Sequence, residues 1–340
     1  MLSKENFPLV AVLTPVFNGA RYLDETMQCV QGSDYPNLVH VLLDNASTDA
    51  TPAIIERYRG GQVPIVSRRN DRTIPMNDNF NAVAALTPAG AKYVRLLCAD
   101  DLMAPSAISR MVAVAERRDD VSVVGCQCAN VGVMGIELDR RTEIFTGASI
   151  VKAYLRRQTM VLSGTHFLFR RSVFDALGQQ YDPSLASSDA DCVIRVALEG
   201  AFGFVHDVLA KFRHHESSYS AKVATKNGAH LFEWLTLLDR YALKVMSEAE
   251  YSECRRIYRR YLLRRSLLRL VKHGDQEFFS LQLRRLAELD DSAGIFDFAG
   301  ALGEWAFFAA TGQRHRVGAP RNVRGGTHSN PGSITGDPSQ

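Results

Sequence analysis

The chain reads Tyr93-Val94-Arg95-Leu96-Leu97-Cys98-Ala99-Asp100-Asp101 where an apolar run gives way to two adjacent acids, and Pro105 follows shortly after. The run is typical of a buried strand, and a helix can begin at a proline such as Pro105. Acids at the C-terminal end of a central strand lie where open α/β sheets bind ligands. Two neighbouring carboxylates repel each other, and a divalent cation that carries a diphosphate would relieve that repulsion. The alternative is that Asp101 or a neighbour only caps the helix after Pro105.

Strand and helix patterns alternate through the first 130 residues. Apolar runs predict strands at 9–14, 39–43, 63–66, 93–97 and 121–125. Apolar residues at helical spacing, or a proline in a first turn, predict helices around 23–30, 51–58, 77–86 and 108–115. Fully apolar strands joined by helices indicate an α/β fold whose mostly parallel sheet is covered on both faces.

The second half of the chain is less regular. It predicts helices at 148–157 and 190–198, and strands at 166–170, 202–205 and 209–213. Beyond 229 the pattern is almost wholly helical, and after 313 it is polar and rich in glycine. We therefore predict an α/β domain over 1–225, a basic helical region over 226–312 and a disordered tail over 313–340.

Composition excludes several classes of protein. A net charge of +3 gives no bulk argument for nucleic-acid binding, and 46% apolar content is ordinary for a soluble fold. The six cysteines are scattered, and the Cys126-x-Cys128 pair has no second pair to complete a zinc site. The early apolar run ends at Pro15, which is too short for a signal peptide, and no stretch approaches a membrane span. We expect a cytoplasmic protein.

Polar segments follow three of the predicted strands. They begin at Thr14, Asp44 and Asp100, and a fourth acidic segment, Ser188-Asp189-Ala190-Asp191, begins a helix. The carboxyl ends of parallel strands meet at one edge of a sheet, so the first three segments should converge there. Convergence of this kind favours a nucleotide-type ligand.

These segments resemble the glycosyltransferase family 2 enzymes, which are inverting nucleotide-sugar transferases of the GT-A fold. The resemblance runs from about 9 to 220 and is carried by six short motifs in the family's order. They are Leu13-Thr14-Pro15-Val16-Phe17-Asn18, Leu43-Asp44-Asn45-Ala46-Ser47-Thr48-Asp49, Asn79-Phe80-Asn81 with Cys98-Ala99-Asp100-Asp101, Phe169-Arg170-Arg171, Ser188-Asp189-Ala190-Asp191 with Arg195, and Phe212-Arg213-His214-His215 with Ser218 and Ser220.

The resemblance implies roles for individual residues on the donor side. Thr14, Pro15 and Phe17 would form the wall of the nucleoside pocket, and Asp44 would bind the base or ribose. Asp100 would contact the ribose or sugar. Asp101 would bind the Mg²⁺ or Mn²⁺ that bridges the donor diphosphate.

Further roles concern the acceptor and the closing loop. Asp189 would be the general base, and a carboxylate at a helix N-terminus stays ionised as that role requires. Arg213 and His215 would belong to a loop that closes over the diphosphate, and Asn81 and Asp191 are further candidates for substrate contact.

Several of these residues have plainer interpretations. The family often has Glu-Asp where this chain has Ser188-Asp189, so Asp191 is a rival base, and either acid could simply serve the helix N-terminus. Ser47, Thr48 and Asp49 are expected to cap the helix at Pro52, with Thr51 as N-cap. His166 is expected to pack within a strand, although it could reach the acceptor, and His215 could be an ordinary loop histidine. The basic residue on the diphosphate side is Arg68, Arg69 or Arg72.

The segment 255–272 is a basic amphipathic helix with eight cations and no acid. One interpretation is peripheral contact with an anionic membrane, at the inner face where a lipid-linked saccharide would be extended. The other is a helix–helix interface.

The sequence thus predicts a cytoplasmic, metal-dependent glycosyltransferase that moves a sugar, foremost from a UDP-sugar, to a saccharide or lipid-linked saccharide in cell-surface polysaccharide synthesis. Two alternatives are a sugar-nucleotide nucleotidyltransferase, which lacks its Gly-rich phosphate loop here, and a catalytically degenerate assembly subunit.

Overall fold

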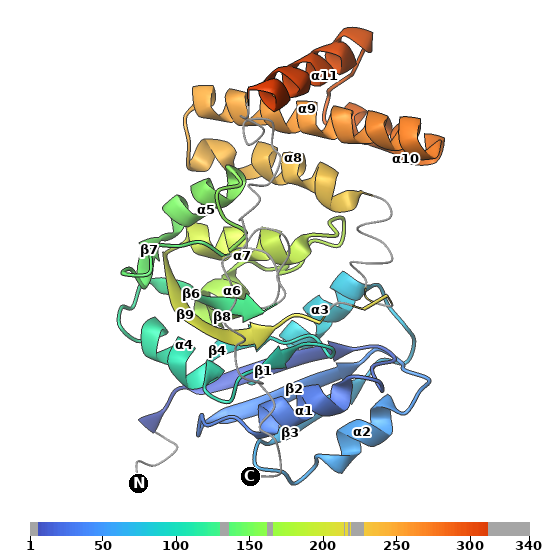
Figure 1. Cartoon of the computed structure of the whole chain (residues 1–340). Helices are drawn as coiled ribbons and strands as arrows, with labels where there is room; N and C mark the ends of the chain where they lie inside the picture. Colours follow the sequence, from blue (N-terminus) through green and yellow to red (C-terminus); the bar gives the residue numbers. More distant parts are fainter. Residues whose placement is uncertain are drawn as a thin grey trace.

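The computed structural model describes residues 6–129, 136–161, 166–213, 215–216, 218 and 228–311. The predicted tail over 313–340, the predicted boundary at 225–226, and His214 and Ser220 lie outside the described residues. Figure 1 shows a sheet whose faces carry helices, with a stack of further helices at one end of the molecule.

A nine-stranded sheet forms the centre of the fold, in the order β3-β2-β1-β4-β8-β6-β9-β5, with β7 paired to β9. The strands are β1 (Leu9–Val16), β2 (Leu38–Asp44), β3 (Ile65–Arg69), β4 (Ala91–Leu96), β5 (Leu102–Met103), β6 (Val121–Ala129), β7 (Ile144–Thr146), β8 (Phe167–Arg170) and β9 (Ala201–Lys211). The first four strands in this order are parallel, and β8 is antiparallel to both of its neighbours. Because β6 and β9 then point the same way as β1, the sheet is mostly parallel, as predicted.

Helices cover both faces, and more of them follow at the C-terminus. They are α1 (Leu23–Gln31), α2 (Thr51–Arg57), α3 (Met76–Ala85), α4 (Ala107–Ala115), α5 (Gly147–Leu155), α6 (Arg171–Ala176), α7 (Ser188–Leu198), α8 (Ala229–Tyr241), α9 (Glu248–His273), α10 (Gln276–Ala287) and α11 (Ile295–Ala310). Alternate residues of β1 face opposite ways: Ala11 and Leu13 join the core under α3, α5 and α7, whereas Val10 and Val12 join the core under α4. Period-two burial of this kind is what a sheet covered on both sides requires.

The C-terminal helices α8–α11 pack on one another beyond α5 and α7 (Figure 1). The 26-residue α9 begins with a capping box, in which Ser247 and Glu250 satisfy each other's backbone N–H groups, and ends at Gly274 in the left-handed conformation (φ 67°). Across the described ranges, no helix is both long enough and apolar enough to pass through a bilayer.

Two local expectations were wrong. The strands predicted at 202–205 and 209–213 form one strand, β9, because bulges in its pairing with β6 let it continue through the exposed Asp207. The helix expected at Pro105 begins at Ala107, because residues 102–103 first pair with the end of β9 as β5.

Two histidines are buried in or beside the sheet, and neither forms an ion pair with an acid among the described residues. His40 is fully buried and its Nε2 lies 2.9 Å from Thr14 Oγ1. His166 is 2% exposed beside the ring of Phe167, which confirms the expected packing role. Burial lowers the pKa of each ring to about 3, so both are neutral in the folded protein at pH 7.

We predict that these histidines make the fold acid-sensitive. An unfolded histidine takes up a proton below about pH 6.5, whereas the folded rings do not until about pH 3, so stability is complete above pH 6.5 and is lost as pH falls. As pH falls from 7 to 5.5, each ring should lower the free energy of unfolding by about 1 kcal/mol. In urea unfolding, the free energy of unfolding of His166→Phe should fall by about 1 kcal/mol less than that of wild type over this pH range. An unchanged pH dependence would mean that folded His166 accepts the proton.

Candidate active site

The predicted convergence at one sheet edge is present. The ends of β1 and β2 are paired at Val16 and Asp44, and the amide of Leu97, just after β4, donates to the carbonyl of Leu13 over 2.9 Å. The loops that follow β1, β2 and β4 therefore leave the sheet side by side. Each carries the polar residues that the sequence placed at a strand end.

The loops after β1 and β2 are bound directly to each other. The amides of Asn18 and Gly19 donate to Ser47 Oγ and Thr51 Oγ1, each over 2.9 Å, and the amide of Ala20 donates to Asp49 Oδ2 over 3.0 Å. The expected cap of α2 is therefore corrected: the N-cap is Ala50, which makes no side-chain cap. These hydroxyls fix the neighbouring loop instead, although Asp49 also accepts from the amide of Thr51.

Asp44 is 3% exposed and has fixed partners. Its Oδ1 accepts from the amide of Ser47 over 2.9 Å, and its Oδ2 pairs with the guanidinium of Arg69. Of the three basic candidates on this side, Arg69 is thus the one that contacts a predicted site residue. Ala46, between these groups, has φ 58°, a left-handed conformation that costs a non-glycine residue about 1–2 kcal/mol.

The three residues expected to line the nucleoside pocket have different positions. Phe17 is 52% exposed, so its ring is available at the mouth of the site. Thr14 is fully buried and bonded to His40, and Pro15 is also buried. Thr14 and Pro15 thus lie inside the sheet, and of the three only Phe17 is exposed; the contact of Thr14 and Pro15 with the nucleoside stays a prediction.

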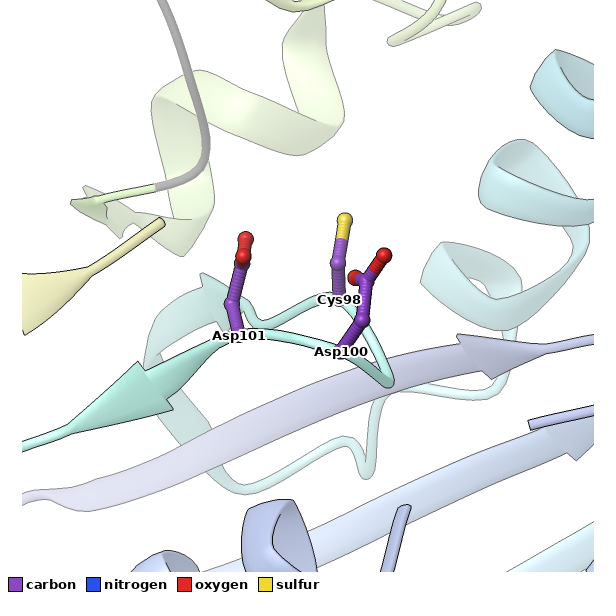
Figure 2. Close-up of side chains that lie close together, drawn as sticks. All are labelled: Cys98, Asp100 and Asp101. Atoms are coloured by element: carbon purple, nitrogen blue, oxygen red, sulfur yellow. The ribbon is translucent and has the colours of Figure 1, made fainter. Parts of the chain in front are cut away.

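The loop after β4 brings three potential ligand atoms together. Ligand atoms of Cys98, Asp100 and Asp101 lie within 4.8 Å of one another, and Figure 2 shows the three side chains on the same side of the loop. Asp101 is 4% exposed, whereas Asp100 is half-buried. The hydroxyl of Thr26 on α1 donates to the carbonyls of Ala99 and Asp101, each over 3.0 Å, and so fixes the turn.

Arg213 and His215, which follow β9, contact these acids. The amide of Arg213 donates to Asp101 Oδ1 over 3.1 Å, and its Nε donates to the carbonyl of Asp100 over 3.0 Å. Nε2 of His215 lies 2.9 Å from Asp100 Oδ2.

Two further residues, which the sequence analysis did not find, support this loop. Glu25 accepts two hydrogen bonds of 3.0 Å from the guanidinium of Arg213, and these bonds lower the pKa of Glu25. The centre of the Tyr22 ring lies 4.7 Å from the guanidinium of Arg213 and 4.6 Å from the centre of the His215 ring. Both residues lie at the start of α1. The helical spacing of the sequence does not indicate that they contact Arg213 and His215.

The two rival bases at the start of α7 differ in exposure. Asp189 is partly exposed in the first turn. Asp191 is 1% exposed, and its oxygens accept from Arg195 Nε over 2.9 Å and from the hydroxyl of Tyr241 over 2.6 Å. Buried and held in this way, Asp191 serves packing between α7 and α8, which argues against its expected contact with substrate.

Amides of α3 hold the segment that leads into α7. Asn81 donates to the carbonyl of Tyr181 over 2.7 Å and accepts from its amide over 2.9 Å. Asn77 donates to the carbonyls of Asp182 and Leu185 and accepts from the hydroxyl of Ser188. Both ends of the Asn81 amide thus bind backbone, and its expected contact with substrate stays a prediction.

A residue from the C-terminal helices completes this arrangement. Glu233 on α8 is 7% exposed and accepts from the amide of Ala186 and, over 2.7 Å, from the amide of Ser187. These amides immediately precede Ser188 and Asp189. Sequence reasoning missed Glu233 because its partners lie more than 45 residues away and belong to the backbone.

Known proteins are similar to this chain over different lengths. Residues 11–178 match Glycosyl transferase family 2. The Bacillus subtilis protein TuaG, named as a glycosyltransferase of teichuronic acid biosynthesis, is 30% identical over 98 residues, which are 28% of this chain and 36% of that protein. Matches to two further bacterial relatives span 37% and 42% of their lengths, so the chain spans about two fifths of these curated relatives.

Solved structures extend the likeness to most of the chain. S. aureus TarS 1–349, in complex with UDP-GlcNAc, has a TM-score of 0.62 at 14% identity and covers 91% of this chain and 89% of that one. The mannosyltransferase PcManGT from Pyrobaculum calidifontis, in complex with GDP-Man and Mn²⁺, has a TM-score of 0.53 at 15% identity and covers 92% and 86%.

At these low identities the solved structures support the fold alone. It is the GT-A fold that the sequence predicted. The sequence match covers the strands and loops that carry Phe17, Asp44, Asp100 and Asp101, and it ends before Asp189. Through residues 11–178, the chain belongs to glycosyl transferase family 2.

Proposed function

We propose that this chain transfers a sugar from a nucleoside-diphosphate donor to a hydroxyl of a saccharide or glycolipid acceptor, with inversion at the transferred carbon. The observation that carries the proposal is the pair Asp100–Asp101 at the strand end, closed over by Arg213 and His215, in a chain of this family. This arrangement suits a diphosphate, because anions need cations and N–H donors around them.

The donor would lie along the edge formed by the loops after β1, β2 and β4. Phe17 offers an exposed ring for the nucleoside, and Asp44 lies beside it at the end of β2. We propose a UDP-sugar foremost. TarS holds UDP-GlcNAc and PcManGT holds GDP-Man, so both uracil and guanine nucleotides occur on this fold.

A divalent metal, Mg²⁺ or Mn²⁺, would be held by Asp101 together with Asp100. The donor set fits, because two carboxylates at a turn are what these oxygen-preferring ions use alongside phosphate oxygens and water. The thiol of Cys98 is a less suitable ligand for Mg²⁺. When bound, the metal would neutralise the charge that develops on the departing diphosphate.

The remaining chemistry belongs to the chain itself. We assign Asp189 as the general base, because it is the accessible acid of its pair and the helix N-terminus keeps its carboxylate ionised. It would take the proton from the acceptor hydroxyl as that oxygen bonds to the sugar. Arg213 and His215 would hold the diphosphate side and exclude water from the donor.

The acceptor is proposed to be part of a cell-surface polysaccharide, which is consistent with the name of TuaG. Of the two roles predicted for 255–272, the ion pairs of α9 support the helix–helix role: Arg255 and Arg259 pair with Asp291 in the loop after α10. Peripheral membrane contact through the rest of α9, and a place on the cytoplasmic side of the membrane, stay predictions.

The donor site is tested by calorimetric titration of UDP, dTDP, GDP and CDP with and without Mn²⁺. We expect one nucleotide to bind only with the metal, and Asp101→Asn to weaken it roughly 10- to 100-fold, which corresponds to one charged contact. Asp119→Asn, at an exposed acid outside the site, is the matched control and should bind as wild type. If no nucleotide binds under either condition, the site assignment fails and the degenerate-subunit alternative gains support.

The base is tested by the rate at which nucleoside diphosphate is released from the sugar donor. Asp189→Asn should lower this rate on the order of 10²- to 10⁴-fold and leave nucleotide affinity unchanged. Asp191→Asn should instead lower the free energy of unfolding, because it weakens the contacts with Arg195 and Tyr241. Full activity of Asp189→Asn would show that Asp189 is not the general base.

The turn that carries the base is tested through Glu233. Glu233→Gln removes the charged acceptor of two backbone amides, so we expect the free energy of unfolding to fall by about 1–3 kcal/mol. Turnover should fall while nucleotide affinity is retained, since the described partners of Glu233 are the amides of Ala186 and Ser187 and not the loops after β1, β2 and β4. The matched control is Glu253→Gln, an exposed glutamate on α9. Equal behaviour of the two variants in both measurements would contradict the assignment.

A further inference from the structure

The C-terminal helices enclose a pocket of about 770 Å³ that none of the active-site residues lines. It lies between α8, α9 and α10, next to the end of α5. Its walls combine cations and aromatic rings, chiefly Arg157, Trp234, Tyr261, Arg265, Arg269 and Lys272. A concave site with a few charged groups on aromatic walls is typical of a site for a discrete ligand.

The charge of the pocket is strongly positive. Among the described residues that line it, four are arginine or lysine and one is an acid, Asp275, which accepts from Arg269 Nε over 2.7 Å. Arg265 and Lys272 are exposed, and neither makes an ion pair with any described residue. Cations that outnumber the acids around them repel one another, so this arrangement favours an anionic ligand.

Four arginines in the first half of α9 form ion pairs with acids of neighbouring segments. Arg255 and Arg259 pair with Asp291 over 2.8 and 2.9 Å, and Arg256 and Arg260 pair with Glu304 of α11 over 2.6 and 2.8 Å. These four arginines serve packing between helices. In the second half Arg269 pairs with Asp275, whereas Arg265 and Lys272 line the pocket and have no ion-pair partner among the described residues.

Arg157 joins the cations to the aromatic wall. Its guanidinium lies 5.2 Å from the ring centroids of both Trp234 and Tyr261. Its backbone has φ 55°, a left-handed conformation that disfavours non-glycine residues. Arg157 follows the end of α5, where the amide of Gln158 donates to the carbonyl of Ala153 over 2.9 Å, and this turn places its guanidinium near both rings.

We propose that this pocket binds an anionic saccharide, the phosphate- or carboxylate-bearing part of the acceptor. The cations would pair with the anionic group, and the rings would pack against the sugar faces. The proposal rests on the proposed function, because it supplies the acceptor side of the same transfer.

Helix α8 connects the pocket to the base. Trp234 lines the pocket, and the adjacent Glu233 holds the amides of Ala186 and Ser187 just before Asp189. The pocket and the base-bearing turn thus contact neighbouring residues of one helix, whose diameter with side chains is about 10–12 Å. An extended acceptor anchored in the pocket could therefore present its next hydroxyl to Asp189.

The test uses the fluorescence of Trp234. The chain has two tryptophans, so Trp305→Phe on α11 leaves Trp234 as the single reporter. In this background we would titrate glucose 6-phosphate, glucuronate and neutral glucose, and separately vesicles of phosphatidylglycerol or phosphatidylcholine. The pocket variant is Arg265→Ala with Lys272→Ala. The charge-matched control is Arg140→Ala with Arg284→Ala, at two exposed arginines outside the pocket.

We expect a saturable signal with glucose 6-phosphate or glucuronate, and none with glucose. The pocket variant should weaken it at least tenfold, whereas the control should not change it. Absence of the signal, an equal response to glucose, or an unchanged pocket variant would overturn the proposal. A response to phosphatidylglycerol vesicles alone would also overturn it and identify a lipid contact. Nucleotide calorimetry on the same variants separates this outcome from failure of the donor site.

Discussion

The mutual repulsion of Asp100 and Asp101 is the constraint around which the site is arranged. Two carboxylates at adjacent positions are tolerated because the fold brings donors to both: the amide of Arg213 to Asp101, and the ring of His215 to Asp100. Those donors come from the end of β9, more than 110 residues further along the chain. The sheet order that places β9 near this edge is therefore a condition for keeping the acids together.

The same edge is stabilised by contacts between loops that are distant in sequence. Ser47, Asp49 and Thr51 bind the amides of the loop after β1, and Arg69 holds Asp44. The backbone of the edge proposed to bind the donor is thus held by contacts within the protein. Preorganised donors and acceptors of this kind lower the cost of ordering the site on binding.

Much of this fold could be predicted from the sequence, because apolar runs and helical spacing report burial directly. The parallel direction of β1, β2 and β4, and with it the convergence of Asp44 and Asp100–Asp101 at one edge, followed from that pattern. Residue roles that depend on a distant partner did not follow. Thr14 binds His40 inside the sheet, Asn81 binds the backbone of Tyr181, and Asp191 is held by Tyr241. Local spacing contains no information about such partners.

The contact of Glu233 with the turn before Asp189 divides the site between two parts of the chain. The loops proposed to bind the donor depend on the α/β sheet, whereas the turn before the proposed base, Asp189, also depends on α8. Proteins open locally in cooperative units whose free energies differ. An opening confined to the C-terminal helices would leave donor binding intact and release the base, so that the chain retains its nucleotide without transferring the sugar. Catalysis could in this way be interrupted reversibly by partial unfolding at one end of the molecule.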